Sequence, residues 1–292
     1  MNYINAGKEN STDIKLYYED HGEGRPVVLI HGWPLSCESW EKQTQALLNA
    51  GCRVIAYDRR GFGRSSRPGT GYDADTFAED LNRVMTQLDL RDAVLVGFSM
   101  GGVEVARYMG RYGRERVSAV VFMAAVTPYL GRTPANQQGV AGNVFANIRE
   151  ALLSDRPAFI TGFLNDFFNA DVLKGKRVSE EVIRACWNIG VGASPKGTLD
   201  CVDSWLTDFR ADLKAITVPT QVIHGDSDRI LPMEATAARM KEFVKDCKVS
   251  IIPGGPHGLN WTHAAEVNSE LLPFIKQLKP YQARELAGAG RK

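Results

Sequence analysis

AVLVGFSMGG, residues 93–102, is an apolar run followed directly by a serine between glycines. The run predicts a buried strand, and the residues after it predict a helix that continues to Arg111. Gly97 and Gly101 suit a sharp strand-to-helix turn, because a Cβ at either position would collide with neighbouring backbone. Such a turn lifts the Ser99 hydroxyl out of the sheet and places it at a helix N-terminus, where backbone N–H groups favour developing negative charge. Ser99 is therefore the candidate nucleophile.

Apolar runs alternate with helical periodicities through most of the chain. Continuous apolar strands separated by amphipathic helices predict a mostly parallel sheet covered by helices on both faces. The clearest helical stripe consists of Phe77, Leu81, Val84, Met85 and Leu88. Strands are expected over 13–19, 26–30, 53–57, 93–96, 117–125, 219–223 and 248–252, and further helices around 40–48, 101–111, 233–243 and 267–278.

The alternation stops between about Thr127 and Leu213, where the sequence has helical fragments but no convincing strand. We interpret residues 128–213 as a helical cap over the carboxyl edge of the sheet, and residues 1–127 and 214–292 as the core. Packing of the cap is the expected role of its aromatic side chains. These are Phe145, Phe159, Phe163, Phe167, Trp187 and Trp205.

Composition excludes several classes of function. The 292 residues carry 35 Lys and Arg against 34 Asp and Glu, which disfavours nucleic-acid binding. The chain has neither a signal-peptide pattern nor about 18 consecutive apolar residues, so we expect a cytoplasmic protein with no membrane partner. The five cysteines are scattered without metal-ligand spacing and predict free thiols and no metal site. The tail beyond Gln282 has little to bury, and we expect it to be frayed.

A serine hydroxyl needs a base, and the chain has only five histidines. His257 and His263 alone follow the last predicted strand, where the fold would bring a base back to the nucleophile. The glycine-rich loop around His257 favours that residue. A carboxylate must orient the imidazole, and the segment after the 219–223 strand offers Asp226 and Asp228. The residues alone do not separate these two, and one of them is expected to be a solvated turn residue.

Two backbone N–H groups are needed to hold an oxyanion. The first would come from Met100, the residue after the nucleophile. The second is expected from the loop after the 26–30 strand, and the N–H of Trp33 is our candidate. Gly32 lets this backbone approach closely, while Pro34 has no N–H and biases Trp33 towards an extended conformation.

HGWPL, DRRGFGRS, VGFSMGG, AVTP, HGDSDRILP and PHG occur in this order. With them the chain, from about residue 13 to 277, resembles the cofactor-free haloperoxidase and aryl-esterase branch of the α/β-hydrolases. The resemblance implies a mostly parallel eight-stranded sheet flanked by helices, with the cap inserted after the sixth strand. It implies a catalytic triad in the family's chain order, with the second aspartate of the G-D-x-D run as the acid, and no cofactor or metal. The implied triad is Ser99, Asp228 and His257, the implied oxyanion donors are Trp33 and Met100, and the implied acyl-pocket residues are Phe98, Leu130, Phe163 and Ile230.

Similar proteins hydrolyse small esters through an acyl-enzyme. Many also carry out perhydrolysis, in which hydrogen peroxide replaces water and releases a peracid that oxidises halide. A proline after the oxyanion residue, as at Pro34, is associated with members that favour perhydrolysis. Relatives are often homo-oligomers, commonly built from trimers. The resemblance therefore implies a serine esterase and perhydrolase with a small acyl substrate.

Other functions share these motifs. An amidase or γ-lactamase with the same triad is the closest alternative, and a carbon–carbon bond hydrolase would use it too. Epoxide hydrolases and haloalkane dehalogenases use aspartate where this chain has Ser99. A non-catalytic binding protein of the same fold is the alternative from another class. With a fluorophosphonate probe it would form no covalent adduct at Ser99, or an adduct without turnover of any substrate.

Overall fold

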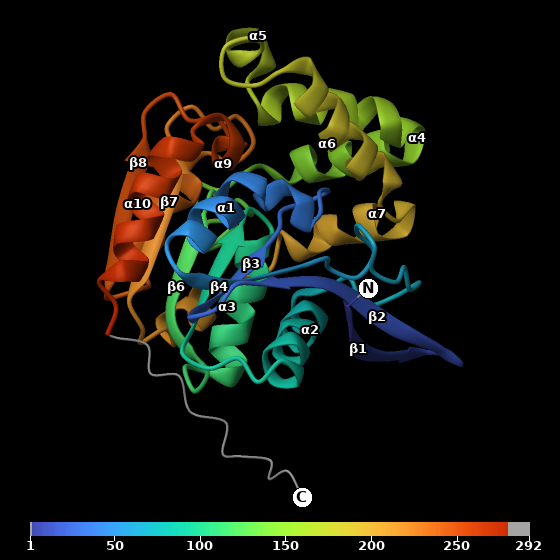
Figure 1. Ribbon diagram of the computed structural model, residues 1–292. Coiled ribbons are helices and arrows are strands. Elements are labelled where there is room, and N and C mark those ends of the chain that lie inside the picture. Colours follow the sequence, from blue (N-terminus) through green and yellow to red (C-terminus); the bar gives the residue numbers. More distant parts are fainter. Residues whose placement is uncertain (1, 280–292) are drawn as a thin grey trace, which may run out of the picture.

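Continuous apolar runs form the strands at the centre of the sheet, because helices cover both of their faces. The computed structural model describes residues 2–279, and over these residues it contains an eight-stranded sheet between two helical layers (Figure 1). The predicted fold class is confirmed. The tail beyond Gln282 lies outside the described residues. The strands are β1 (Asn2–Glu9), β2 (Thr12–His21), β3 (Arg25–Ile30), β4 (Cys52–Tyr57), β5 (Ala93–Phe98), β6 (Val117–Met123), β7 (Thr220–Gly225) and β8 (Cys247–Ile252).

The strand order is β1-β2-β4-β3-β5-β6-β7-β8, which puts β5 in the middle of the sheet. The β1–β2 and β2–β4 pairs are antiparallel, and the other pairs are parallel. Parallel strands end at the same edge, so the loops that follow β3, β5, β7 and β8 meet there.

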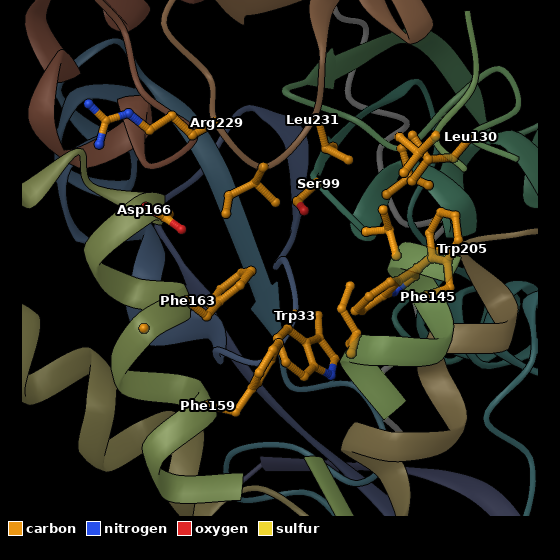
Figure 2. Close-up of a pocket in the computed structure, with 16 residues that line it drawn as sticks. Trp33, Ser99, Leu130, Phe145, Phe159, Phe163, Asp166, Trp205, Arg229 and Leu231 are labelled. Carbon is orange, nitrogen blue, oxygen red and sulfur yellow. The ribbon is translucent and has the colours of Figure 1, made fainter. Parts of the chain in front are cut away.

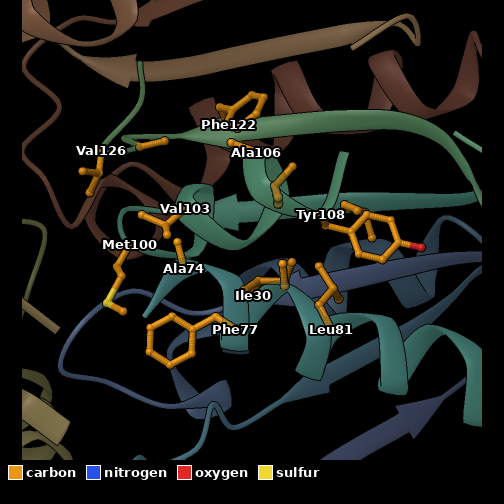
Figure 3. Close-up of a cluster of buried hydrophobic side chains, with 14 of the residues drawn as sticks. Ile30, Ala74, Phe77, Leu81, Met100, Val103, Ala106, Tyr108, Phe122 and Val126 are labelled. Carbon is orange, nitrogen blue, oxygen red and sulfur yellow. The ribbon is translucent and has the colours of Figure 1, made fainter. Parts of the chain in front are cut away.

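Alternate residues of β3 fill the two faces of the sheet. Val28 and Ile30 belong to a buried cluster with apolar side chains of α2 and α3, such as Phe77 (Figure 3). Val27 and Leu29 belong to a second cluster with side chains of α1 and α10. The predicted helical stripe is confirmed, since four of its side chains are buried in α2 and the fifth packs against them. These helices are α1 (Glu41–Asn49), α2 (Ala74–Gln87), α3 (Gly101–Tyr112) and α10 (Ala264–Lys276).

Two local predictions were wrong. The first strand is not the one predicted from residue 13 but β1, an edge strand whose mixed sequence buries little beyond Ile4 and Ala6. The expected helix over 233–243 is instead two 3₁₀ segments, η2 (Met233–Ala235) and η3 (Ala237–Glu242). The backbone breaks between them at Thr236, whose hydroxyl donates to the carbonyl oxygen of Pro232. A spacing of three residues in this segment fits a 3₁₀ turn as well as a helix.

Helices fill the insertion between β6 and β7, and Figure 1 shows α4, α5 and α6 on one side of the sheet, beyond its carboxyl edge. The longest, α4, bends at Asp155, whose backbone is not helical, two residues before Pro157. The chain returns to the core through α8, which packs against α3. No helix within residues 2–279 has the length and apolarity to cross a membrane. The helices of the insertion are α4 (Gly142–Phe167), α5 (Ala170–Leu173), α6 (Glu180–Gly192), α7 (Pro195–Ser204) and α8 (Arg210–Lys214).

Candidate active site

The turn after β5 holds Ser99 in a left-handed backbone conformation, with φ of 53°. Neighbouring backbone packs so closely around this turn that positions 97 and 101 have room only for glycine. A Cβ on Gly97 would lie 2.6 Å from the carbonyl oxygen of Gly101, and a Cβ on Gly101 would collide with the carbonyl oxygen of Ile30. A non-glycine residue at positive φ carries strain, and such strain often occurs at functional sites. The predicted strand, turn and helix around Ser99 are all present.

A continuous chain of hydrogen bonds starts at Ser99. Its Oγ lies 2.9 Å from Nε2 of His257, and Nδ1 of His257 lies 2.7 Å from Oδ2 of Asp228. A carboxylate can only accept, so Nδ1 carries the proton and Nε2 is left to accept one from the serine hydroxyl. The side chains of His257 and Asp228 are almost fully buried. The structure thus brings together the three residues that the resemblance implied.

The two candidate aspartates have different partners. Oδ1 of Asp228 accepts hydrogen bonds of 2.8 Å from the backbone N–H groups of Ile230 and Leu231. Burial acts to raise the pKa of Asp228, but the neighbouring imidazoles and backbone N–H groups outweigh it and hold the pKa below its ordinary value. Asp226 is exposed and accepts from the N–H of Gly254 and a neighbouring hydroxyl, as a turn residue does.

Aromatic rings enclose the imidazole of His257. The Phe98 and Phe167 rings each lie 5.2 Å from it, centroid to centroid. Phe98 is fully buried and does not line the cavity beside Ser99, although the resemblance implied a pocket role for it. As the last residue of β5 it packs instead against His257 and Trp40, inside the core. His263 hydrogen-bonds Thr262 and does not join this chain.

Two backbone donors are available near Ser99. Within residues 2–279, the N–H groups of Trp33 and Met100 donate no hydrogen bond to another residue. The Trp33 loop lies against Ser99, since a Cβ on Gly32 would stand 3.0 Å from the Cβ of Ser99. Free donors at such a place are what a developing oxyanion requires.

The DRRGFGRS motif holds this loop. Nε2 of His31 accepts from the backbone N–H of Arg59 at 3.0 Å, and the Arg59 guanidinium donates to the His31 carbonyl oxygen at 2.8 Å. Arg59 also forms a buried ion pair with Glu104 of α3, whose carboxylate accepts from the Tyr57 hydroxyl as well. Burial and the nearby arginine hold the pKa of His31 well below its ordinary value, so its ring stays neutral. The loop with Trp33 is therefore fixed to the helix that follows Ser99.

A cavity of about 470 Å³ opens beside Ser99 (Figure 2). Leu130, Phe163 and Ile230 line it, in line with the resemblance, and so does the side chain of Trp33. The lining is apolar apart from the Ser99 hydroxyl and the charged side chains of Asp166 and Arg229, and Arg229 is paired with Asp171 at 2.8 Å. Four of the six cap aromatics contribute to the lining. The resemblance had implied this role for one of them, Phe163, whereas the other three were expected only to pack the cap. The four are Phe145, Phe159, Phe163 and Trp205.

The described residues 2–279 contain no group of three or more His, Cys, Asp or Glu side chains placed to hold a metal ion. All five cysteines lie in this range as free thiols. Burial raises the pKa of Cys186 to about 12 and of Cys247 to about 11, so these thiols are poor nucleophiles at neutral pH.

Comparisons with known proteins give a consistent picture. A model of the α/β hydrolase fold matches residues 25–264. A Synechocystis protein named "Putative non-heme chloroperoxidase" is 59% identical over 94% of this chain and 100% of its own length. The bifunctional esterase/perhydrolase DCH of Acinetobacter calcoaceticus is 36% identical over 90% of this chain and 96% of its own. The crystal structure of a bromoperoxidase from Bacillus anthracis superimposes with a TM-score of 0.91 at 48% identity, covering 94% of this chain and 99% of that one.

Proposed function

The chain belongs to the α/β-hydrolase family, and we propose that it is a serine hydrolase that cleaves small carboxylic esters through an acyl-enzyme. We propose further that hydrogen peroxide can replace water as the acceptor of the acyl group. The observation that carries the proposal is the hydrogen-bonded chain from Ser99 through His257 to Asp228, with two free backbone N–H groups beside it. The relatives named above as chloroperoxidase and as esterase/perhydrolase support the choice of reaction.

In the first step Ser99 attacks the ester carbonyl while Nε2 of His257 takes the hydroxyl proton. Asp228 stabilises the imidazolium that forms and keeps Nδ1 protonated. The N–H groups of Trp33 and Met100 would receive the oxyanion of the tetrahedral intermediate. His257 then returns the proton to the departing alkoxide, and the C–O bond of the ester breaks to leave an acyl group on Ser99.

In the second step the acceptor attacks the acyl-enzyme. His257 takes a proton from water or from hydrogen peroxide, and the tetrahedral intermediate collapses with Ser99 as the leaving group. Water gives the carboxylic acid, and hydrogen peroxide gives the peracid. Either route returns the serine hydroxyl and consumes no cofactor.

The cavity supports an apolar substrate. Its volume of about 470 Å³ exceeds the needs of an acetyl group, and its walls offer few polar groups to a charged acyl chain. Phe163 and Trp33 meet edge to face, with ring centroids 5.1 Å apart, and form part of an aromatic wall beside Ser99. We propose that this wall binds an aromatic or aliphatic portion of a neutral ester, together with Leu130 and Ile230, which also line the cavity.

The test is an activity panel with a fluorophosphonate probe. We expect the wild type to hydrolyse p-nitrophenyl acetate and to be labelled at Ser99. Ser99→Ala should lose about five orders of magnitude in kcat and all labelling, since removal of a nucleophile leaves only residual catalysis. Retained hydrolysis in Ser99→Ala contradicts the assignment.

The same panel separates the alternatives. Acetate with peroxide and a halide indicator measures perhydrolysis, and a bicyclic lactam measures amidase activity. A labelled protein without turnover of any substrate indicates a binding protein. From the sequence and its resemblance we also propose that the protein is cytoplasmic and forms a trimer-based homo-oligomer. Light scattering after size-exclusion chromatography tests the oligomeric state.

A further inference from the structure

His224 is a buried imidazole to which the proposed mechanism assigns no task. It is the penultimate residue of β7, and its side chain is fully buried. Its Nε2 lies 3.1 Å from the carbonyl oxygen of Leu231 and 3.3 Å from Oδ2 of Asp228. A carbonyl oxygen can only accept, so Nε2 carries the proton. Nδ1 has no hydrogen-bond partner among the described residues, and His224 is therefore a neutral donor.

Two imidazoles thus converge on one carboxylate oxygen. Oδ2 of Asp228 lies 2.7 Å from Nδ1 of His257 and 3.3 Å from Nε2 of His224. The other oxygen is occupied by the backbone N–H groups of Ile230 and Leu231. Because His224 also holds the carbonyl of Leu231, it braces the same turn whose N–H groups hold the carboxylate. Backbone N–H groups thus hold one carboxylate oxygen, and His257 hydrogen-bonds the other, with Nε2 of His224 3.3 Å from that second oxygen.

We propose that His224 is a positioning residue for the acid of the triad. Its Nε2–H fixes the plane of the Asp228 carboxylate and draws part of the negative charge away from His257. This inference rests on the triad proposed above. The dipole of a neutral N–H group 3.3 Å from Oδ2 offsets part of the charge of the carboxylate, so Asp228 stabilises a protonated His257 less strongly than it would alone. The base then remains unprotonated, and active, at lower pH.

The surroundings of His224 keep it in the donor form. Burial lowers its pKa, and the positive charge of a protonated His257 acts in the same direction. Asp228 and Glu234, the latter on the 3₁₀ segment η2, act to raise the pKa but do not overcome burial. A neutral His224 can therefore serve throughout the working range of the enzyme.

The experiment compares His224→Leu with His224→Gln across a full pH profile. Leucine removes the donor, whereas a glutamine amide nitrogen reaches about where Nε2 lies. We expect His224→Leu to lower kcat about tenfold, because the Asp228 carboxylate and the turn at Leu231 both lose the Nε2–H group that faces them, with KM changed little. The acid limb of its pH profile, where activity falls as the pH is lowered, should move to higher pH. The reason is that Asp228 then carries its full charge and keeps His257 protonated at higher pH. His224→Gln should restore both kcat and the limb.

A role confined to bracing the turn gives a different result. In that case both variants lower thermal stability, and the acid limb stays where it is in the wild type. An acid limb that stays in place or moves down in His224→Leu overturns the inference, as does an equal loss of kcat in both variants. If His224→Leu does not fold, His224→Asn replaces it, because the shorter amide cannot reach Asp228.

Fluorophosphonate labelling of the wild type is measured alongside. An unlabelled wild type contradicts the proposed function itself. A labelled wild type with an unchanged His224→Leu profile contradicts only the role of His224.

Discussion

The floor and the cap wall of the cavity differ in how their residues are held. The floor consists of Ser99, His257 and Asp228 with the loop of Trp33, and directional hydrogen bonds join the side chains of these three residues. The cap wall consists of Phe145, Phe159, Phe163 and Trp205, which line the cavity. The rings of Phe159, Phe163 and Trp205 each contact the ring of Trp33, and Phe159 stacks on Phe163.

This difference predicts where the loss of a single atom should change activity. A hydrogen bond to a buried charge is lost completely when one atom changes, so substitutions in the floor should abolish activity. Apolar contact scales with the area that remains, so substitutions in the cap wall should change activity in a graded way that depends on the substrate. In the proposed function the floor carries out the reaction, and the cap wall selects the acyl group that is transferred to Ser99.

The sharpest test of the floor compares its two aspartates. Asp228→Asn should lower kcat about 10⁴-fold, because an amide beside Nδ1 favours the wrong tautomer of His257. Asp226→Asn is the matched control, two residues away in the same turn, and should change kcat by less than about twofold since Asp226 is exposed. Steady-state hydrolysis of p-nitrophenyl acetate measures both. Similar losses in the two variants would remove the distinction that the hydrogen bonds make.

Alanine substitutions at two glycines compare how tightly the backbone packs in the floor and in the cap. A Cβ on Gly101 would collide with the carbonyl oxygen of Ile30, whereas a Cβ on Gly162 of α4 would meet no atom within 4 Å. We expect Gly101→Ala to lower the free energy of unfolding by about 3 kcal/mol, because the central sheet must shift. Gly162→Ala should raise it by about 0.5–1 kcal/mol, because alanine favours a helix.

Denaturant titration of both glycine variants measures these changes. The contrast fails if Gly101→Ala is as stable as the wild type, since the tight turn around Ser99 would then tolerate a side chain. It also fails if Gly162→Ala is the less stable of the two.

Much of the floor could be predicted from the sequence, because glycines and strand ends report on local backbone geometry. Ser99 and His257 follow from such signals. The choice of Asp228 over Asp226 came from the resemblance, since both aspartates lie in one turn and differ only in which partner each meets. His224 gave no signal, because its contact with Asp228 depends on how the turn after β7 folds back.

The cap wall could not be predicted to the same depth. Its six aromatic residues look alike in the sequence, yet Phe167 packs against His257 and Trp187 donates to the carbonyl oxygen of Pro157 instead of lining the cavity. Which side of α4 faces Ser99 depends on the bend at Asp155 and on how the cap meets the sheet. Neither is a property of local sequence.

The cap wall itself is tested at Phe163, whose ring lines the cavity and contacts that of Trp33. Phe163→Ala should lower kcat/KM for p-nitrophenyl butyrate about tenfold, which corresponds to about 1.4 kcal/mol of lost apolar contact. The loss for the acetate ester should be smaller, because a shorter acyl group touches less of the wall. Leu153→Ala, at an exposed position of the same helix, is the control and should match the wild type. An equal fall in kcat for both esters would place Phe163 with the floor, as a support for the Trp33 N–H.

The smallest expected effect concerns stability against pH, to which the buried imidazole of His224 beside Asp228 should contribute, whereas residues 128–213 contain no histidine. The pKa of His224 is lowered by burial, so the folded protein keeps this ring neutral while the unfolded chain takes up a proton below about pH 6.5. Above that pH His224 is neutral in both the folded and the unfolded chain and has no effect on stability. Below that pH only the unfolded chain binds the proton, so the free energy of unfolding falls, by at most about 1.4 kcal/mol per pH unit.

His224→Gln removes this titrating group and should make the decline of unfolding free energy between pH 7 and pH 5 shallower by about 1 kcal/mol. His21→Gln is the matched control, because His21 is exposed and its replacement should leave the slope unchanged. Urea titrations at several pH values measure the three slopes. Equal slopes in the wild type and His224→Gln would mean that His224 takes up a proton without unfolding, and the floor would then be less rigid than its hydrogen bonds indicate.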